Sequence, residues 1–173
     1  MKLEGELGSE RVILRQMKES DISQNFIQWL SNPETNRFLE VRHNPPNLKR
    51  QLAYVQECED SSEKLYLGIF LKDSTMIGST TLTKHSYNKV EIGLMIGDKN
   101  FRGQGLGCEV VRTVINWAKL DGFSEVTAGY LHGNEASAQL FSSLGFEVIH
   151  DTLAGDPVRR ESVVIRTSLK LGT

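Results

Sequence analysis

The fold is decided by the stretch Val90-Glu91-Ile92-Gly93-Leu94-Met95-Ile96-Gly97, which is followed after Asp98-Lys99-Asn100-Phe101 by Arg102-Gly103-Gln104-Gly105-Leu106-Gly107. Its first part has the period of a strand, with glycines inside and at the end of it. Its second part carries glycine at alternate positions and leads directly into residues with helical apolar spacing. The stretch therefore predicts a strand, a glycine-rich loop and a helix from about Gly105 to Leu120.

The glycine-rich loop predicts an anion site. Glycine allows backbone N–H groups to turn toward a ligand, and a helix start adds unpaired N–H donors and the positive end of the helix dipole. Arg102 adds a positive charge that suits a phosphate. A P-loop is excluded, because Cys108-Glu109 follows the last glycine in place of Lys-Ser or Lys-Thr. A dinucleotide fingerprint is excluded too, because Val110 stands where its third glycine would fall. A glycine-rich turn without a ligand remains the alternative.

Both sides of this stretch alternate between strand and helix patterns. The order predicts an α/β (α+β) fold, with one mixed sheet flanked by helices in a single domain over residues 1–173. The predicted strands are Arg11–Met17, Lys64–Leu71, Met76–Lys84, Lys89–Asp98, Ser124–Leu131, one from Phe146 and Ser162–Leu171; the other predicted helices begin near Ser20, Pro45 and Glu135.

The composition is that of an ordinary globular protein. The 173 residues carry a net charge of −2, which indicates neither nucleic acid nor an anionic membrane as a partner. No segment reaches the roughly 18 consecutive apolar residues of a membrane helix, and the N-terminus lacks the apolar core of a secretion signal. The two cysteines fall in different segments and are expected to be free, so we expect a cytoplasmic protein. The four histidines show no metal-ligand spacing, so no metal is predicted.

Four stretches of the chain resemble a known family. Arg102–Gly107 resembles the Arg/Gln-x-x-Gly-x-Gly/Ala signature of the GNAT (Gcn5-related) N-acetyltransferases. The strand with Glu91-Ile92-Gly93, the pair Asn134-x-x-Ser137 and the closure Leu144-Gly145-Phe146 are similar to the same family. The branch that the chain resembles includes the ribosomal-protein N-terminal acetylases and amino-sugar acetyltransferases of polysaccharide loci.

The resemblance implies acetyl-CoA as co-substrate, bound in a V-shaped gap between two parallel strands, Val90–Gly97 and Ser124–Leu131. It implies that Leu94, Met95 and Ile96 bind the pantetheine arm through their backbone. The diphosphate is expected on the N–H groups of Arg102, Gly103, Gln104, Gly105, Leu106 and Gly107. Asn134 resembles an asparagine that contacts CoA, although it suits the N-cap of the following helix equally well.

Acetyl transfer needs a neutral amine. An alkyl amine has a pKa near 10, so at neutral pH roughly one molecule in a thousand is uncharged. A carboxylate within reach, directly or through a water, can take the proton. Glu91 is the candidate base, since strand alternation places it with Gly93 and Met95 on one face; an ion-paired strand glutamate is the alternative. The N–H of Met95 is the expected oxyanion donor.

The general acid is less defined. Many relatives carry a tyrosine where this chain has Phe141, which has no proton to give but is still expected beside the cofactor. Ser137 matches a serine placed near the CoA sulfur in the N-terminal acetylase branch, and a small packing residue is its alternative. Tyr130 is held in reserve as acid and as a substrate contact. Direct attack by the amine without a dedicated acid stays open.

The acceptor is the least defined part. In the family, the region of Glu40 and Arg42 borders the acceptor, so both are candidate substrate contacts; a solvated loop is the alternative. The leading hypothesis is an amino sugar or a sugar nucleotide, from the likeness of Trp29–Arg42 to polysaccharide-locus enzymes. A protein N-terminus, a polyamine and a non-catalytic acyl-CoA-binding module are the alternatives. Dimers are common in the family, so a homodimer is left open.

Overall fold

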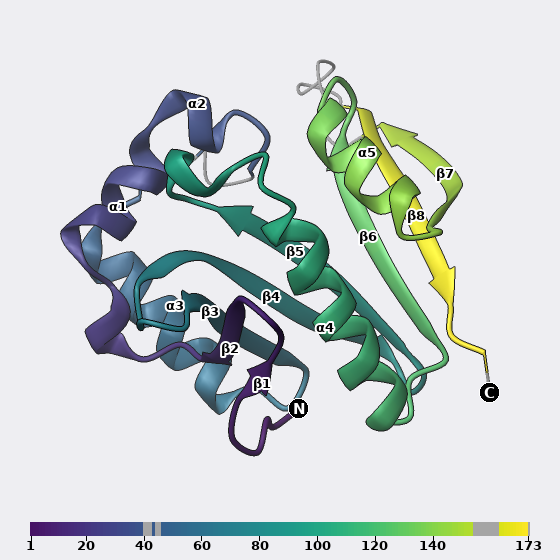
Figure 1. Cartoon of the computed structure of the whole chain (residues 1–173), viewed down its shortest axis with the longest axis horizontal. Helices are drawn as coiled ribbons and strands as arrows, with labels where there is room; N and C mark the ends of the chain where they lie inside the picture. The colour runs from purple at the N-terminus through teal and green to yellow at the C-terminus, as the bar shows by residue number, and fades with distance from the viewer. Residues whose placement is uncertain (40–42, 44–45, 154–162, 173) are drawn as a thin grey trace.

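The computed structural model describes residues 1–39, 43, 46–153 and 163–172. They form one eight-stranded sheet in the order β1-β2-β3-β4-β5-β6-β8-β7 (Figure 1). All neighbouring strands pair antiparallel except β5 and β6, which pair parallel, so the predicted mixed α/β sheet is confirmed. The strands are β1 (Leu7–Gly8), β2 (Val12–Gln16), β3 (Lys64–Leu71), β4 (Met76–Ser86), β5 (Lys89–Ile96), β6 (Glu125–Leu131), β7 (Glu147–Leu153) and β8 (Val163–Lys170). The helices are α1 (Gln24–Ser31), α2 (Pro33–Asn36), α3 (Leu48–Asp60), α4 (Leu106–Leu120) and α5 (Glu135–Ser143), with short 3-10 turns at Glu19–Asp21 and Lys99–Phe101.

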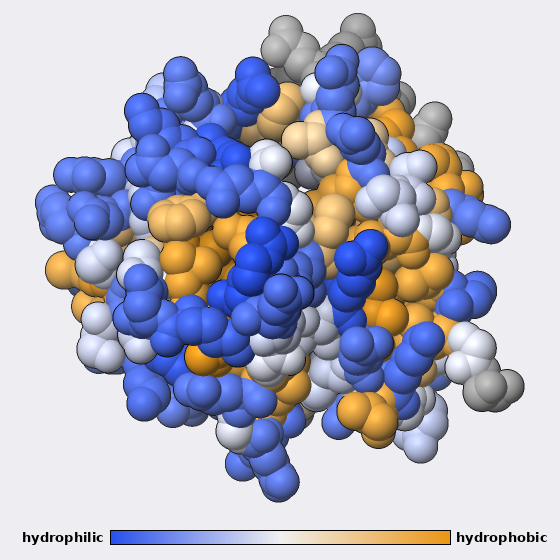
Figure 2. All heavy atoms as spheres, in the orientation of Figure 1, coloured by the Kyte–Doolittle hydropathy of each residue, from blue (hydrophilic) through white to orange (hydrophobic). Residues whose placement is uncertain are grey.

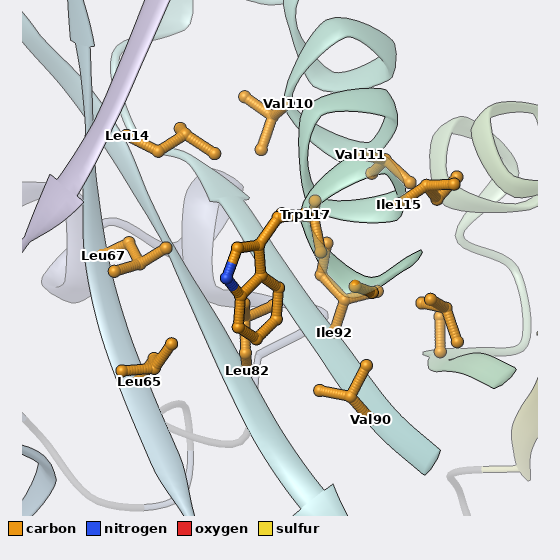
Figure 3. Packing of buried hydrophobic residues seen from close by; sticks show 14 of the residues in the cluster. Leu14, Leu65, Leu67, Leu82, Val90, Ile92, Val110, Val111, Ile115 and Trp117 are labelled. Carbon is orange, nitrogen blue, oxygen red and sulfur yellow. The ribbon is translucent and has the colours of Figure 1, made fainter. Parts of the chain in front are cut away.

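The sheet carries a core on each face. The larger core packs α4 and α5 against the strands, with the α4 stripe of Val110, Val111 and Val114 fully buried (Figure 3). Trp117 from the last turns of α4 lies in the same cluster. The smaller core packs α1 and α3 against the other face and includes Met95. Burying a stripe of this kind supplies the hydrophobic free energy that holds α4 to the sheet.

Two expectations about the first half need adjustment. The helix that was predicted near Pro45 begins at Leu48, because the side chain of Asn47 accepts a hydrogen bond from the N–H of Arg50 and caps it. The turn expected after Asn32 contains the four-residue helix α2, with Pro33 in its first turn. Short elements of this kind have too few residues to show a period.

The two parallel strands part halfway along. β5 pairs with β6 from Lys89, opposite Glu125, to Ile92, opposite Ala128. Beyond this point β5 continues beside β4 as far as Ile96, and β6 continues beside β8 as far as Leu131. The strands therefore diverge and leave a V-shaped gap, which Figure 1 shows between β5 and β6. The predicted gap is confirmed.

The closed end of this gap is held by a buried carboxylate. Glu125 is 6% exposed and accepts a hydrogen bond from Ser168 at 2.6 Å. Its other oxygen lies 2.5 Å from Nζ of Lys170 and 3.3 Å from Nζ of Lys89. Burial acts to raise the pKa of this carboxyl, but these hydrogen bonds outweigh it and lower the pKa from 4.5 to about 2. The network therefore joins β5, β6 and β8 with a carboxylate that stays ionised.

Within the described part of the chain, no helix is long and apolar enough to cross a membrane. The same residues contain no group of three or more His, Cys, Asp or Glu side chains that would hold a metal ion. Cys58 is buried, Cys108 is partly buried, and both are free thiols, as predicted.

We predict that Glu125 makes stability depend on acid pH. The unfolded chain takes up the proton near pH 4.5 and the folded chain only near pH 2, so the contribution is present above the first value and is lost between the two. The difference in unfolding free energy between the wild type and Glu125→Gln should shrink over this window, as measured by urea unfolding at several pH values. A difference that stays constant from neutral pH to pH 3 would contradict the assignment.

Candidate active site

The loop before α4 presents a row of unpaired N–H groups. Gly103 and Gly105 have φ angles of +72° and +77°, which an L side chain rarely adopts. Within the described residues, the backbone N–H groups of residues 103–108 have no hydrogen-bond partner, while the N–H of Arg102 donates to the carbonyl of Lys99. Leu106 is buried and fixes the start of the helix. The loop and the positive end of a 15-residue helix therefore have the geometry and polarity that suit an anion.

The side chain of Arg102 turns away from this loop. Its Nε donates to the carbonyl of Ile96 at 2.9 Å, and its Nη2 donates to the carbonyl of Gly97 and to the hydroxyl of Thr35. These bonds tie the end of β5 to α2. The Arg102 guanidinium, which was expected beside a phosphate, is thus hydrogen-bonded within the protein. Residues 103–107, also predicted to bind the diphosphate, present backbone N–H groups.

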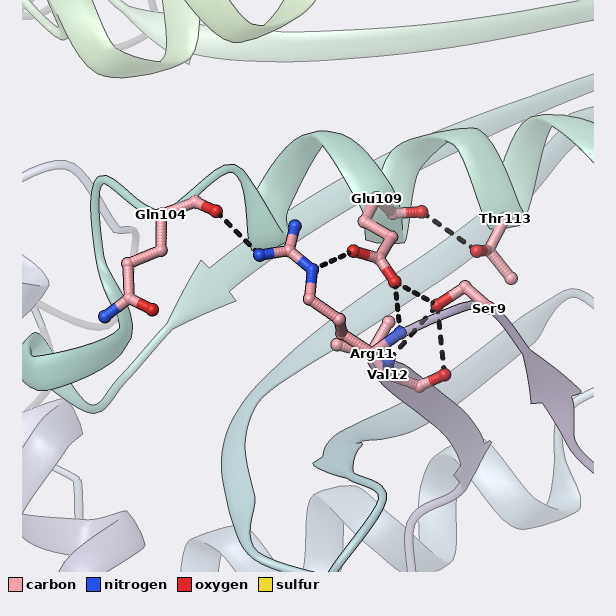
Figure 4. A network of polar contacts seen from close by, with 6 residues as sticks. All are labelled: Ser9, Arg11, Val12, Gln104, Glu109 and Thr113. Atoms are coloured by element: carbon pink, nitrogen blue, oxygen red, sulfur yellow. Dashed lines mark hydrogen bonds and ion pairs between the residues drawn. The ribbon is translucent and has the colours of Figure 1, made fainter.

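A network that sequence inspection missed fixes the helix start (Figure 4). Glu109, in the first turn of α4, accepts hydrogen bonds from the hydroxyl of Ser9 at 2.7 Å and from the backbone N–H of Arg11 at 2.6 Å. Nε of Arg11 lies 2.7 Å from the same carboxylate, and Nη1 donates to the carbonyl of Gln104. Burial acts to raise the pKa of the Glu109 carboxyl, but the bonds from Ser9 and Arg11 outweigh it and lower the pKa. The Arg11 charge thus offsets a carboxylate that would repel an anion at the loop.

The main chain of β5 faces the gap at alternate residues. The N–H of Gly97 donates to the carbonyl of Ile77, and the register continues from Gly78 opposite Ile96 to Thr80 opposite Leu94. In an antiparallel pair, every second residue exchanges hydrogen bonds with its partner. The polar groups of Met95 therefore point to β4, where its carbonyl lies over Gly78. The polar groups of Leu94 and Ile96 point away from β4, toward the gap.

This register corrects the expected oxyanion donor. The N–H of Met95 was predicted to face the reacting carbonyl, but it is turned to β4, so the N–H of Leu94 is the donor that lies on the gap side. Strand alternation predicts which side chains share a face of the sheet. It does not predict which backbone N–H groups point to which neighbouring strand, because that depends on the pairing register. The Met95 side chain belongs to the smaller core.

A pocket of about 480 Å³ opens on the opposite face of β5. Gly93, Leu94 and Met95 form its floor, so the residues that leave the parallel pairing also line this pocket. Its other described lining residues are Leu30, Leu39, Gln51, Tyr54, Tyr66, Ser79 and Thr81. Tyr54 and Tyr66 were missed by the sequence reasoning, because they lie on α3 and β3 and only the fold brings them to β5.

The two tyrosines pack edge to face, with ring centroids 5.0 Å apart. Burial raises the pKa of the Tyr54 hydroxyl to about 12 and also raises that of Tyr66. The neighbouring hydroxyls of Thr81 and Ser79 act to lower the pKa of Tyr54 and of Tyr66 respectively, but burial outweighs them. The pocket wall is therefore neutral at physiological pH and carries hydroxyl groups beside aromatic faces.

Glu91 lies on the same face as this pocket, where the strands begin to part. One of its oxygens lies 2.7 Å from Nε2 of His85 on β4, and the other accepts a hydrogen bond from Nη1 of Arg166 on β8 at 2.8 Å. The ion-paired glutamate that the sequence left as an alternative thus describes the resting geometry. The role of Glu91 as base stays a prediction.

Residues after β6 lie on the α5 side. Asn134 caps α5 by accepting a hydrogen bond from the N–H of Ser137, so the capping role is confirmed and the contact with CoA stays a prediction. Phe141 is 5% exposed and stacks on Tyr130 with ring centroids 6.2 Å apart, so its ring is part of the core rather than of the gap surface. Tyr130 also lines a second pocket of about 460 Å³, beside Asn134 and Ala138.

The position of Tyr130 changes its expected role. Val126 and Ala128 alternate with it and lie in the larger core, so Tyr130 faces α5, away from Glu91 and the pocket of tyrosines. Contact with an acceptor beside Glu91 is therefore not supported by its orientation. Glu40 and Arg42, the other two candidates for substrate contact, lie outside the described residues.

Apolar surface is visible in the space between α4 and α5, with hydrophilic residues around it (Figure 2). An N–H cradle, a strand edge with free polar groups and an apolar gap together suit a ligand with an anionic end and an extended, amide-bearing arm. Residues 11–147 match the family model described as an acetyltransferase (GNAT) domain. This chain belongs to the GNAT acetyltransferase family.

Relatives of this family member support the same fold. It is 27% identical over 140 residues to an uncharacterised protein of Methanocaldococcus jannaschii, across 79% of this chain and 28% of that protein. The chain thus spans less than a third of that curated relative's length. RimL, a ribosomal L7/L12 alpha-N-protein acetyltransferase solved with coenzyme A, has a TM-score of 0.81 at 15% identity, over 96% of this chain and 98% of that one. A spermidine N-acetyltransferase from Vibrio cholerae, solved with CoA and spermine, has a TM-score of 0.77 at 12% identity, over 92% and 95%.

We predict that Gly105→Ala weakens binding of coenzyme A by roughly tenfold or more, since hydrogen bonds to a charged group contribute about 1.5–3 kcal/mol each. A Cβ at a φ of +77° forces the loop to move and turns its N–H groups away. Titration calorimetry measures the affinity. Gly5→Ala is the matched control, because Gly5 has a φ of +79° and its Cβ would meet nothing within 4 Å, while at Gly105 it would make only an ordinary contact with Nη2 of Arg11 at 3.7 Å. Equal affinities in both variants would contradict the N–H cradle.

Proposed function

We propose that this chain transfers an acetyl group from acetyl-CoA to the primary amine of an amino sugar or a sugar nucleotide. One observation carries the proposal: Gly93, Leu94 and Met95 border the gap on one side and form the floor of the tyrosine pocket on the other. A thioester held in the gap and an amine held in the pocket would meet at these three residues.

The chain offers suitable groups for the cofactor. The unpaired N–H groups of residues 103–108 would bind the diphosphate. The gap-facing backbone groups of Leu94 and the N–H of Ile96 would bind the pantetheine arm as an added strand. The carbonyl of Ile96 already accepts from Arg102. Acetyl-CoA supplies an acyl thioester, whose carbonyl oxygen would accept a hydrogen bond from the N–H of Leu94 as negative charge develops on it.

Glu91 would supply the base. Its carboxylate lies on the pocket face, two residues before the floor residue Gly93. An amine arriving as ammonium would lose its proton to this carboxylate through an intervening water. The nitrogen lone pair would then attack the carbonyl carbon and form the C–N bond. As the carbonyl re-forms, the C–S bond breaks, and the second proton lost by the nitrogen goes through water to the departing thiolate. Phe141 has no proton to donate, so the thiolate leaves without a tyrosine acid at that position.

The lining of the pocket favours an acceptor that is rich in hydroxyl groups. None of its described lining residues carries a carboxylate, whereas a polyamine would need several negative charges along its length. Tyr54, which is only partly buried, would offer an aromatic face to the apolar side of a sugar ring, and the partly buried Thr81 would offer a hydroxyl to its polar rim. Tyr66 and Ser79 are buried behind them. The solved relatives named above act on a protein N-terminus and on a polyamine, so the fold alone does not choose the acceptor.

We expect thiol release from acetyl-CoA with amino sugars or nucleotide-linked amino sugars and not with spermidine. The measurement is a thiol-release assay over a panel of amines, with peptides bearing free N-termini included. Turnover with spermidine or peptides alone would replace the sugar hypothesis with one of the alternatives. Calorimetric binding of acetyl-CoA without turnover of any amine would favour a non-catalytic binding module.

We expect Glu91→Gln to lower kcat by about 10²- to 10⁴-fold, the usual contribution of a general base. Binding of acetyl-CoA should be unchanged, because the N–H cradle lies elsewhere. Glu57→Gln is the matched control, since Glu57 is also ion-paired, with Nζ of Lys64 at 2.6 Å, and lies at the surface of α3. If Glu91→Gln keeps the wild-type rate between pH 6 and pH 9, Glu91 is not the base.

A further inference from the structure

Three strands contribute to the surroundings of Glu91. His85 approaches from β4 at 2.7 Å, and Arg166 approaches from β8 at 2.8 Å, each at a different carboxylate oxygen. β6 lies between β5 and β8 in the sheet, so the Arg166 side chain must cross it. The carboxylate is thus held from both sides, in an orientation that one partner alone would not fix.

Gly129 makes this crossing possible. It pairs with Arg166 in the register of β6 and β8. A Cβ at Gly129 would lie 3.1 Å from Nη1 of Arg166 and 3.5 Å from its Cζ. Glycine inside a strand weakens the strand and often marks the close approach of another group. The approaching group here is the guanidinium of Arg166, which passes Gly129 and bonds to Glu91.

Stability does not account for this arrangement. The side chains of Arg166 and Glu91 are 43% and 28% exposed, and that of His85 is 49% exposed. Ion pairs with this exposure contribute little to folding, because water screens them and two long side chains lose freedom. The same face of β8 also carries Lys170, whose exposed side chain pairs with the buried Glu125.

We propose, on the basis of the proposed function, that Arg166 and His85 are positioning residues for Glu91, and that Gly129 is the opening through which Arg166 reaches it. A carboxylate held at both oxygens keeps one orientation toward the acceptor amine. A carboxylate without these two partners rotates about its side-chain bonds and points toward the acceptor amine for only part of the time. Misplacement of a catalytic group by about 1 Å can cost about 10²-fold in rate.

The test compares kcat and KM for Arg166→Gln, Arg166→Lys and Gly129→Ala. We expect kcat to fall about 10- to 100-fold in Arg166→Gln, with KM for acetyl-CoA unchanged. Arg166→Lys should recover part of kcat, and added guanidinium ion should recover part of it in Arg166→Ala. Gly129→Ala should lower kcat with Arg166 intact, by less than Arg166→Gln does, because its Cβ would push the guanidinium aside by a few tenths of an ångström.

Lys170→Gln is the matched control. Lys170 lies on the same strand and the same face as Arg166 and also pairs with a glutamate, but at the closed end of the gap. It should lower the urea midpoint and leave kcat unchanged. Loss of kcat in Lys170→Gln equal to that in Arg166→Gln would reduce Arg166 to a structural role.

The outcomes separate this inference from the proposed function. If Glu91→Gln abolishes turnover while Arg166→Gln and Gly129→Ala keep the wild-type kcat, the positioning role is overturned and the proposed function stands. If Glu91→Gln keeps full activity, or if no amine is acetylated, the proposed function fails first. Retained binding of acetyl-CoA, measured by calorimetry, shows in each variant that the chain is folded.

Discussion

The parting of β5 from β6 after Ile92 and Ala128 is the constraint on which the rest of the structure depends. A sheet is stable when its strands pair along their full length, since unpaired backbone groups lose hydrogen bonds. Here β5 stays paired with β4, and β6 stays paired with β8, to the ends of the strands. The pairing between β5 and β6 stops halfway along. The backbone polar groups of Leu94 and the N–H of Ile96 thereby face the gap without a strand partner, while the carbonyl of Ile96 accepts from Arg102. The buried carboxylate of Glu125 lies at the closed end, where the two strands still pair.

The same divergence leaves a different feature on each face of β5. On the α4 face, the helix start and its glycine loop lie at the wide end of the gap, where a diphosphate would bind (Figure 1). On the other face, α1 and α3 pack against the sheet, and a pocket between them reaches the same three residues of β5. Because side chains alternate along a strand, one short segment borders the gap and also lines this pocket, as the proposed transfer between a cofactor and an acceptor requires.

Charge on the acceptor face is balanced locally. Glu125 and Glu91 lie on one face, and each is held by cations from neighbouring strands. The two differ in burial: Glu125 is 6% exposed and closes the gap, while the side chain of Glu91 is 28% exposed and lies where the gap opens. Burial with full hydrogen bonding keeps the Glu125 carboxylate ionised. The partial exposure of Glu91 leaves its carboxylate within reach of water, as the proposed base role requires.

The sequence by itself determined the mixed sheet, the helix with its glycine loop and the face of β5 that carries Glu91. These follow from local periods and from the backbone freedom of glycine, which neighbouring residues express without reference to the rest of the chain. Only the tertiary structure decided that the Met95 N–H faces β4, that Tyr54 and Tyr66 line the pocket, and that Arg166 reaches Glu91. Each of these depends on which distant strand or helix becomes a neighbour, and contacts between residues far apart in the chain leave no periodic signal.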